Sequence, residues 1–191
     1  MAKKRILICI TGASGTIYGV RLIRALKGLG HEVCLIVSKW GAKTLEHEME
    51  LIPKELAKEV DYVFDNDDLS AGPASGSYHL DAMAIVPCSM KTLAGVAHGY
   101  AETLVGRAAD CSLKEKRPLV LLPRETPFNL IHIRNMAQVV EAGATVIPAS
   151  PAFWHKPKTI EELVDSLIDR ILTHLHAKEK TEIEWSSGSP Y

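Results

Sequence analysis

Arg5-Ile6-Leu7-Ile8-Cys9-Ile10 runs directly into Thr11-Gly12-Ala13-Ser14-Gly15. After its arginine, the first segment is an unbroken apolar run, which is typical of a parallel strand covered by helices on both faces. The second segment is a turn of small residues. Apolar side chains then recur at helical spacing until Gly30, which suits a helix end. A strand, a turn and a helix in this order predict the first unit of a parallel α/β sheet.

The same alternation continues along the chain and predicts the fold class. We expect further strands at residues 32–37, 62–64, 82–86, 119–122 and 145–147. We expect further helices at residues 39–48, 89–98, 103–113, 131–142 and 160–176. The expected fold is a single-domain α/β protein with a doubly wound parallel sheet, a Rossmann/flavodoxin-like sandwich of three layers. This flavoprotein-like domain would span residues 1–176. For the polar tail, residues 177–191, packing on a neighbouring subunit is a hypothesis.

Composition excludes several classes of function. The 191 residues are 47% hydrophobic and 24% charged, which is enough apolar content for one sizeable core. The formal net charge of -1 gives no overall field that would recruit nucleic acid or an anionic membrane. The apolar run at residues 6–10 is too short for a signal peptide or a bilayer span. We therefore expect a cytoplasmic protein.

The four cysteines predict neither disulfides nor a metal site. Cys9, Cys34, Cys88 and Cys111 form no C-x-x-C pair, and in a reducing compartment they are expected to be free, packed thiols. The eight histidines include no H-E-x-x-H motif, and no Cys/His cluster has ligand spacing. The acidic run at residues 65–68 is interpreted as a solvated stretch of a long loop rather than a Mg²⁺ site.

Small and hydroxyl-bearing residues follow three of the expected strands. They are the turn at residues 11–15, Ser38, and the segment at residues 87–92, which contains Ser89 and Thr92. In a doubly wound sheet, ligands bind beyond the carboxyl ends of the strands, and helix N-termini there attract anions. The turn matches neither the dinucleotide fingerprint nor a P-loop. Plain helix capping is a sufficient role for Ser38 taken alone. Together, the three turns favour one site for a phosphate ester.

Two further strand ends carry charged or aromatic side chains. Arg124 and Glu125 lie between two prolines after the strand at 119–122, as a rigid active-site loop would. A surface ion pair is the simpler alternative. After the last strand, residues 148–154 combine two prolines with Phe153 and Trp154, which suits a wall against a planar ring. A packed surface loop is the alternative there.

In order along the chain, these segments resemble the flavin prenyltransferase family of the UbiX type, historically described as aromatic acid decarboxylases. The matching stretches are residues 11–15, 87–92, 107–110, 113–115, 124–127, 135–136 and 148–154. Each motif alone is modest, but the ordered set covers nearly the whole chain and is specific.

The resemblance implies a reaction. Members of the family join a dimethylallyl group from dimethylallyl monophosphate to N5 and C6 of reduced FMN, without metal. The prenylated FMN then serves a UbiD-type decarboxylase, and a flavin reductase supplies reduced flavin. The family also implies a homo-oligomer, commonly a dodecamer, with sites at subunit junctions.

The resemblance also implies roles for individual residues. The residues expected to bind FMN are Gly12, Ala13, Ser14, Ser38, Ser89, Met90, Lys91, Thr92 and Arg124. The residues expected to bind the prenyl phosphate or its allyl group are Arg107, Lys114, Trp154, Arg170 and Trp185. Concentrated positive charge stabilises a phosphate leaving group as its C–O bond breaks. The catalytic candidates are Glu125, Glu48 and Ser14, with Glu125 relaying a proton.

Two features of this chain depart from the family or leave an alternative open. The family usually carries Tyr where this chain has Trp154, so an indole N–H replaces a hydroxyl. Glu46 and Glu48 lie on the same segment, and Glu48 is chosen only by its distance from Ser38. Two other functions remain as alternatives, an FMN-dependent cysteine-type decarboxylase and a flavin carrier without chemistry. The first would carry a P-x-M-N segment, which is absent here.

Overall fold

The computed structural model describes residues 2–181 and 183, and it contains a six-stranded parallel sheet. The strands are β1 (Arg5–Ile10), β2 (Glu32–Val37), β3 (Tyr62–Phe64), β4 (Ala82–Cys88), β5 (Leu119–Pro123) and β6 (Thr145–Val146). They lie in the order β3-β2-β1-β4-β5-β6, and every neighbouring pair is parallel. The order reverses between β1 and β4, so the ligand-binding crevice of such a sheet lies at the carboxyl ends of these two strands.

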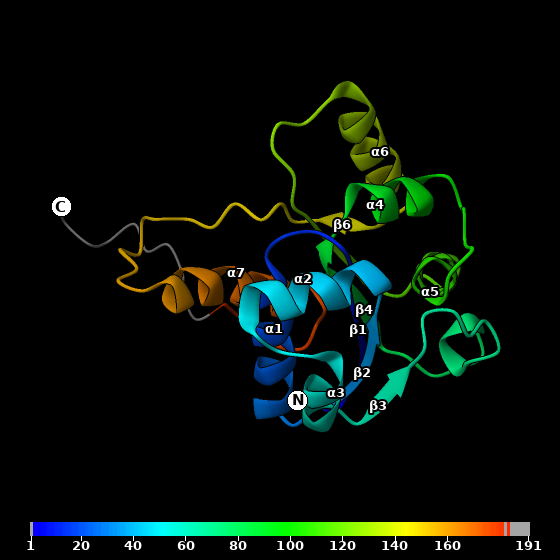
Figure 1. Cartoon of the computed structure of the whole chain (residues 1–191), viewed down its shortest axis with the longest axis horizontal. Coiled ribbons are helices and arrows are strands. Elements are labelled where there is room, and N and C mark those ends of the chain that lie inside the picture. The colour runs from blue at the N-terminus through cyan, green and yellow to red at the C-terminus, as the bar shows by residue number, and fades with distance from the viewer. Residues whose placement is uncertain (1, 182, 184–191) are drawn as a thin grey trace.

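Helices cover both faces of the sheet (Figure 1). They are α1 (Thr16–Gly28), α2 (Lys39–Met49), α3 (Pro53–Leu56), α4 (Met90–Ala97), α5 (Leu104–Lys114), α6 (Leu130–Glu141) and α7 (Ile160–His174). Two 3-10 helices, η1 (Ala57–Glu59) and η2 (Gly72–Ala74), lie in the connections before and after β3.

The core consists of two apolar layers, one on each face of the sheet. Alternate residues of a strand point to opposite faces. Accordingly, Ile6 and Ile8 of β1 pack with the helices α1 and α7, whereas Leu7 and Cys9 pack with α4, α5 and α6. The result is the predicted three-layer α/β sandwich.

Two local features differ from the sequence-based expectation. β4 continues through Pro87 to Cys88, with a shift of register between Ile85 and Cys88 where it pairs with β5. Proline has no N–H to donate, and the irregular pairing accommodates it. Helix α3 was not expected, because its four residues are too few to show a helical period.

Candidate functional site

Thr11 ties the carboxyl end of β1 to that of β4. Its Oγ1 donates a hydrogen bond to the Pro87 carbonyl at 2.8 Å and accepts one from the Ser89 N–H at 2.8 Å. Its own N–H donates to the same carbonyl at 3.2 Å. The side chain is buried, so these bonds are shielded from water. Thr11 therefore fixes the two turns at the switch point relative to each other.

Gly12 lies directly against the first turn of α2. A Cβ added at Gly12 would overlap the Cβ of Trp40, so only glycine fits here. Ser38 caps α2, because its Oγ accepts a hydrogen bond from the Gly41 N–H at 3.0 Å, while the Ser38 N–H donates to the Ile10 carbonyl. The turn after β1 and the start of α2 thus form one rigid unit.

Glu48 of α2 caps helix α1. Its carboxylate accepts hydrogen bonds from the N–H groups of Gly15 and Thr16 and from the Thr16 hydroxyl, at 2.8–3.1 Å. Gly15 itself has no side chain to do this. Burial raises the pKa of the Glu48 carboxyl, but hydrogen bonds from Ser14, Thr16 and Gly15 outweigh it and hold that pKa below its ordinary value. Glu48 is therefore a carboxylate at neutral pH, and it is the glutamate of this segment that reaches the turn.

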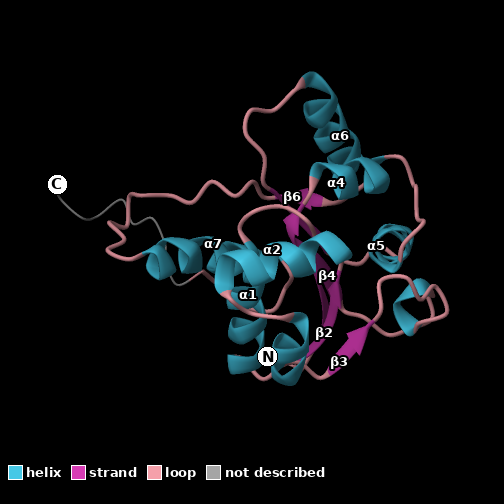
Figure 2. Cartoon of the chain, in the orientation of Figure 1, coloured by secondary structure: helices cyan, strands magenta, loops and turns pink. Residues whose placement is uncertain are grey.

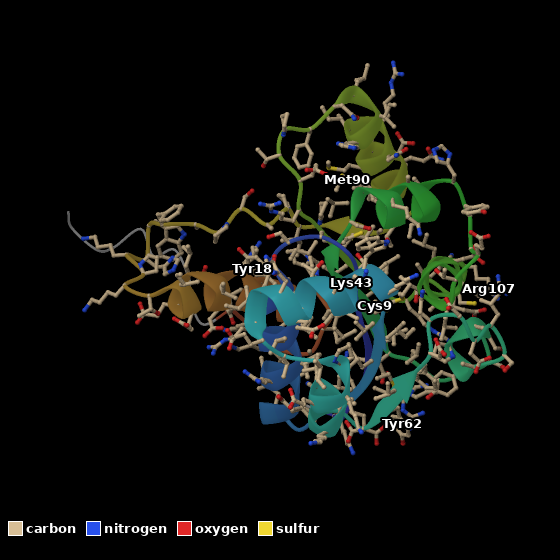
Figure 3. The ribbon with its side chains drawn as sticks, in the orientation of Figure 1. Cys9, Tyr18, Lys43, Tyr62, Met90 and Arg107 are labelled. Carbon is tan, nitrogen blue, oxygen red and sulfur yellow. The ribbon has the colours of Figure 1, made fainter. Side chains whose placement is uncertain are left out.

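The turn after β4 carries hydroxyls at the start of α4. Ser89 caps α4 through a hydrogen bond from the Thr92 N–H at 3.3 Å, and the hydroxyls of Ser89 and Thr92 lie 3.0 Å apart. Met90 and Lys91 form the first turn, and Figure 3 shows Met90 on α4 beside the loop that leads to α6. Ser38 and the segment at 89–92 therefore border the Thr11–Ser14 turn from its two sides.

The loop after β5 places Arg124 and Glu125 beside a small hollow. The Glu125 carboxylate accepts a hydrogen bond from the Thr126 N–H at 3.0 Å. The loop and residues 148–150 surround a space of about 230 Å³. This loop therefore belongs to the same edge of the sheet as the turns.

Trp154 and Arg170 line a larger pocket of about 740 Å³ between the segment after β6 and helix α7. It shares Pro148 and Ser150 with the smaller hollow. Its described lining contains Arg170 and two histidines, no acidic residue, and several apolar side chains. Burial, together with nearby Arg170 and His176, lowers the pKa of His174. A pocket with these properties suits a small phosphate ester whose organic group is apolar.

Arg107 and Lys114 lie elsewhere. The Arg107 guanidinium donates to the Ala74 carbonyl at 3.1 Å and pairs with Asp110 at 2.6 Å. Lys114 pairs with Glu115 at 3.0 Å and borders Gly76. Helix α5, which carries both cations, packs on one face of the sheet, whereas α7, which carries Arg170, packs on the other. Figure 3 shows Arg107 on α5, on the side of the sheet opposite to α7. One chain does not bring Arg107 and Lys114 together with Arg170. Trp185 lies outside the described residues.

Sequence reasoning missed three contributors to this edge. The sequence pattern shows Thr11 only as part of a turn, gives no sign that Glu48 caps a helix, and does not single out Trp40. Each acts through a contact with a residue distant in the sequence, for which no local pattern gives a signal. Gly15 has no side chain that could cap α1, and this is the one hint that a residue from elsewhere in the chain must accept the hydrogen bonds of its first N–H groups.

Three further properties concern the cysteines, possible metal ligands and possible membrane-spanning helices. All four cysteines are free and buried, and burial raises the pKa of Cys34 to about 11 and that of Cys88 to about 12. Among residues 2–181 and 183, no group of three or more His, Cys, Asp or Glu side chains could hold a metal ion. None of the helices in this part of the chain is both long and apolar enough to cross a membrane.

Comparison with known proteins adds an independent line of evidence. The model of the Flavoprotein family matches residues 1–172. The flavin prenyltransferase UbiX of Methanocaldococcus jannaschii is 42% identical over 183 residues, which cover 96% of this chain and 99% of that protein.

Two solved structures are also similar. The crystal structure of AnUbiX (PadA1), in complex with FMN and dimethylallyl pyrophosphate, has a TM-score of 0.94 and 39% identity, covering 98% of this chain and all of that one. A dodecameric FMN-dependent UbiX-like decarboxylase from Escherichia coli O157:H7 has a TM-score of 0.92 and 38% identity, covering 96% of this chain and all of that one.

Proposed function

This chain belongs to the Flavoprotein family and to its flavin prenyltransferases, and we propose that it joins a dimethylallyl group from dimethylallyl monophosphate to N5 and C6 of reduced FMN. The main support for placing this reaction at the switch point is the set of groups that meet at the strand ends there. There, neutral hydroxyl and amide donors adjoin the Arg124–Glu125 loop and an apolar, cationic pocket.

The residues at the turns fit FMN by the chemistry of their donors. Glu48 already occupies the N-terminus of α1, so we place the FMN phosphate near the N-termini of α2 and α4, beside Ser38 and Ser89. Gly12, Ala13 and Ser14 would border the ring system, with Met90, Lys91, Thr92 and Arg124 completing the site. When bound, reduced FMN supplies the two nucleophilic ring atoms, N5 and C6.

The protein supplies charge, orientation and proton transfer. Arg107, Lys114 and Arg170 would hold the phosphate and stabilise its growing negative charge as the C–O bond breaks. Glu125 would move a proton between N5 of the flavin and the leaving phosphate. Ser14 would orient the N5 proton, and the ionised Glu48 would hold Ser14 in place. Trp154 would face the allyl group and offer its indole N–H to the phosphate.

We propose a homo-oligomer, because one chain leaves Arg107 and Lys114 on the opposite face of the sheet from Arg170. A second copy would supply these two cations. The dodecameric Escherichia coli protein, 38% identical, supports this arrangement. The tail at residues 177–191 would contribute Trp185 to the same junction.

The proposed setting is the cytoplasm. A flavin reductase would supply reduced FMN there, and a UbiD-type decarboxylase would receive the product. The cysteine-type decarboxylase and the non-catalytic carrier are not favoured. The first lacks its P-x-M-N segment, and the second would not need Arg107, Lys114, Glu125 and Arg170.

The direct test is the mass of the flavin after turnover. Purified protein is incubated anaerobically with dithionite-reduced FMN and dimethylallyl monophosphate, without added metal, and the flavin is released for mass spectrometry. The expected product is FMN heavier by one C5 prenyl unit. Unmodified FMN released from a protein that binds it well would contradict the proposal. A parallel reaction with dimethylallyl pyrophosphate identifies the preferred donor.

A further inference from the structure

His155 is a histidine whose two ring nitrogens have no hydrogen-bond partner. It lies in the connection between β6 and α7, which Figure 2 shows as a long loop extending away from the sheet. Both nitrogens are shielded from solvent, and neither forms a hydrogen bond within residues 2–181 and 183. In that part of the chain they are the only buried side-chain nitrogen or oxygen atoms without one. Because folded proteins rarely leave a buried polar group unpaired, His155 points to a partner from outside the chain.

The surroundings of His155 indicate the charge of that partner. His155 lines the pocket of about 740 Å³ together with Trp154 and Arg170. Its imidazole packs edge to face against the Trp154 indole, with the ring centroids 5.7 Å apart and the planes at 80°. The described lining of this pocket contains no carboxylate that could accept the imidazole N–H. A pocket with an unpaired donor, a guanidinium and no acidic side chain suits an anionic ligand.

The loop holds the backbone of His155 in place. The Lys156 N–H donates a hydrogen bond to the Phe153 carbonyl at 2.9 Å, which closes a turn around His155. Further along, the Lys158 N–H donates to the Glu162 carboxylate of α7 at 2.7 Å. The turn and this contact anchor the loop to the start of α7, so only the side-chain torsions of His155 remain to bring a ring nitrogen to a ligand.

We propose that His155 binds the phosphoryl group of the prenyl phosphate, donating a ring N–H to one of its oxygens beside Arg170. This inference rests on the proposed function, which places that phosphate in the same pocket. A phosphate monoester carries between one and two negative charges at neutral pH and offers three acceptor oxygens. It can therefore accept from the imidazole and from the guanidinium at once, and hydrogen bonds to such a charged acceptor are strong.

Binding measurements test this role without turnover. Full-length protein is loaded with oxidised FMN, which is not the reduced acceptor of the reaction. Calorimetry then gives the affinity for dimethylallyl monophosphate, and competition gives that for inorganic phosphate. His155→Phe keeps a planar ring against Trp154 but removes both nitrogens. His155→Asn and His155→Gln restore an amide N–H near one ring nitrogen or the other. The matched control is His79→Phe, since the His79 side chain is 73% exposed and does not line this pocket.

We expect His155→Phe to weaken the binding of both phosphates about 10- to 100-fold. At least one of the two amide variants should recover part of the affinity, and His79→Phe should bind like the unmodified protein. Urea unfolding without phosphate checks the fold. The free energy of unfolding of His155→Phe should be unchanged or higher, because the substitution removes polar atoms that have no partner.

Three outcomes would overturn the inference. The first is an unchanged phosphate affinity in His155→Phe, and the second is a failure of both amide variants to recover any affinity. The third is a loss for the prenyl ester alone, which would place His155 against the prenyl chain. The assay for prenylated FMN in the unmodified protein stays separate. A protein that makes no prenylated FMN but binds inorganic phosphate through His155 would contradict the proposed function and keep this phosphate site.

Discussion

At the residue scale, the site depends on a few contacts that a single side chain can break. Thr11 bonds to the Pro87 carbonyl and the Ser89 N–H, more than seventy residues along the chain. Local sequence predicts that residues 11–15 turn, because small residues follow an apolar run. It does not predict which strand end the turn will join, since that choice is made by the topology of the whole sheet.

Gly12→Ala tests this scale, with Gly28→Ala as the matched control. A Cβ at Gly12 would overlap that of Trp40 and force α2 away from the turn, whereas a Cβ at Gly28 would meet nothing. We expect Gly12→Ala to lower the free energy of unfolding by about 1–3 kcal/mol and to weaken FMN binding. Gly28→Ala, at the end of a helix, should raise that free energy by about 0.5–1 kcal/mol and leave FMN affinity unchanged. Urea unfolding and flavin fluorescence titration measure both. Equal effects of the two substitutions would contradict the close fit.

At the scale of elements, the pattern of apolar residues predicts most of the fold. Strands β1, β2 and β3 have the expected bounds, because buried parallel strands are continuous apolar runs bounded by turns. The failures have physical causes. Helix α3 is too short to show a helical period. Strand β4 continues past Pro87 because the hydrogen bonds from Thr11 are accepted by the Pro87 carbonyl, which proline retains. The cap of α1 comes from α2, so no motif near residue 15 reveals it.

Glu48→Gln tests the capping of α1 by α2, with Glu46→Gln as the control. The folded-state pKa of Glu48 is lowered, so its charge stabilises the protein above the ordinary pKa of 4.5, and this contribution is lost as pH falls through the folded-state pKa. At pH 7 we expect Glu48→Gln to lower the free energy of unfolding by about 1 kcal/mol, and the difference from the unmodified protein should vanish in acid. Urea unfolding across the acid range measures this. A constant difference at every pH would show that the charge is not responsible.

At the scale of the whole molecule, the site residues divide into two groups. The turns proposed to bind FMN, Glu125 and Arg170 belong to strand ends or to α7, whereas Arg107 and Lys114 contact the segment before β4. Sequence resemblance predicts all of them as one site but says nothing about which lie together in a single chain. The division into these two groups becomes visible only from the order of the strands and the position of α5 in the structure. The separation is the physical reason to expect that neighbouring copies complete each other's sites.

The measurement that tests this most directly is complementation between two impaired variants. Glu125→Gln and Lys114→Ala chains with different tags are coexpressed, purified through both tags, and assayed for prenylated FMN. If each site takes Glu125 from one copy and Lys114 from another, random mixing should restore about a quarter of the activity of the unmodified protein. Arg107→Ala mixed with Lys114→Ala, both affecting the same group, should restore nothing. Mixed oligomers of Glu125→Gln and Lys114→Ala that remain as inactive as either parent would contradict a site shared between chains.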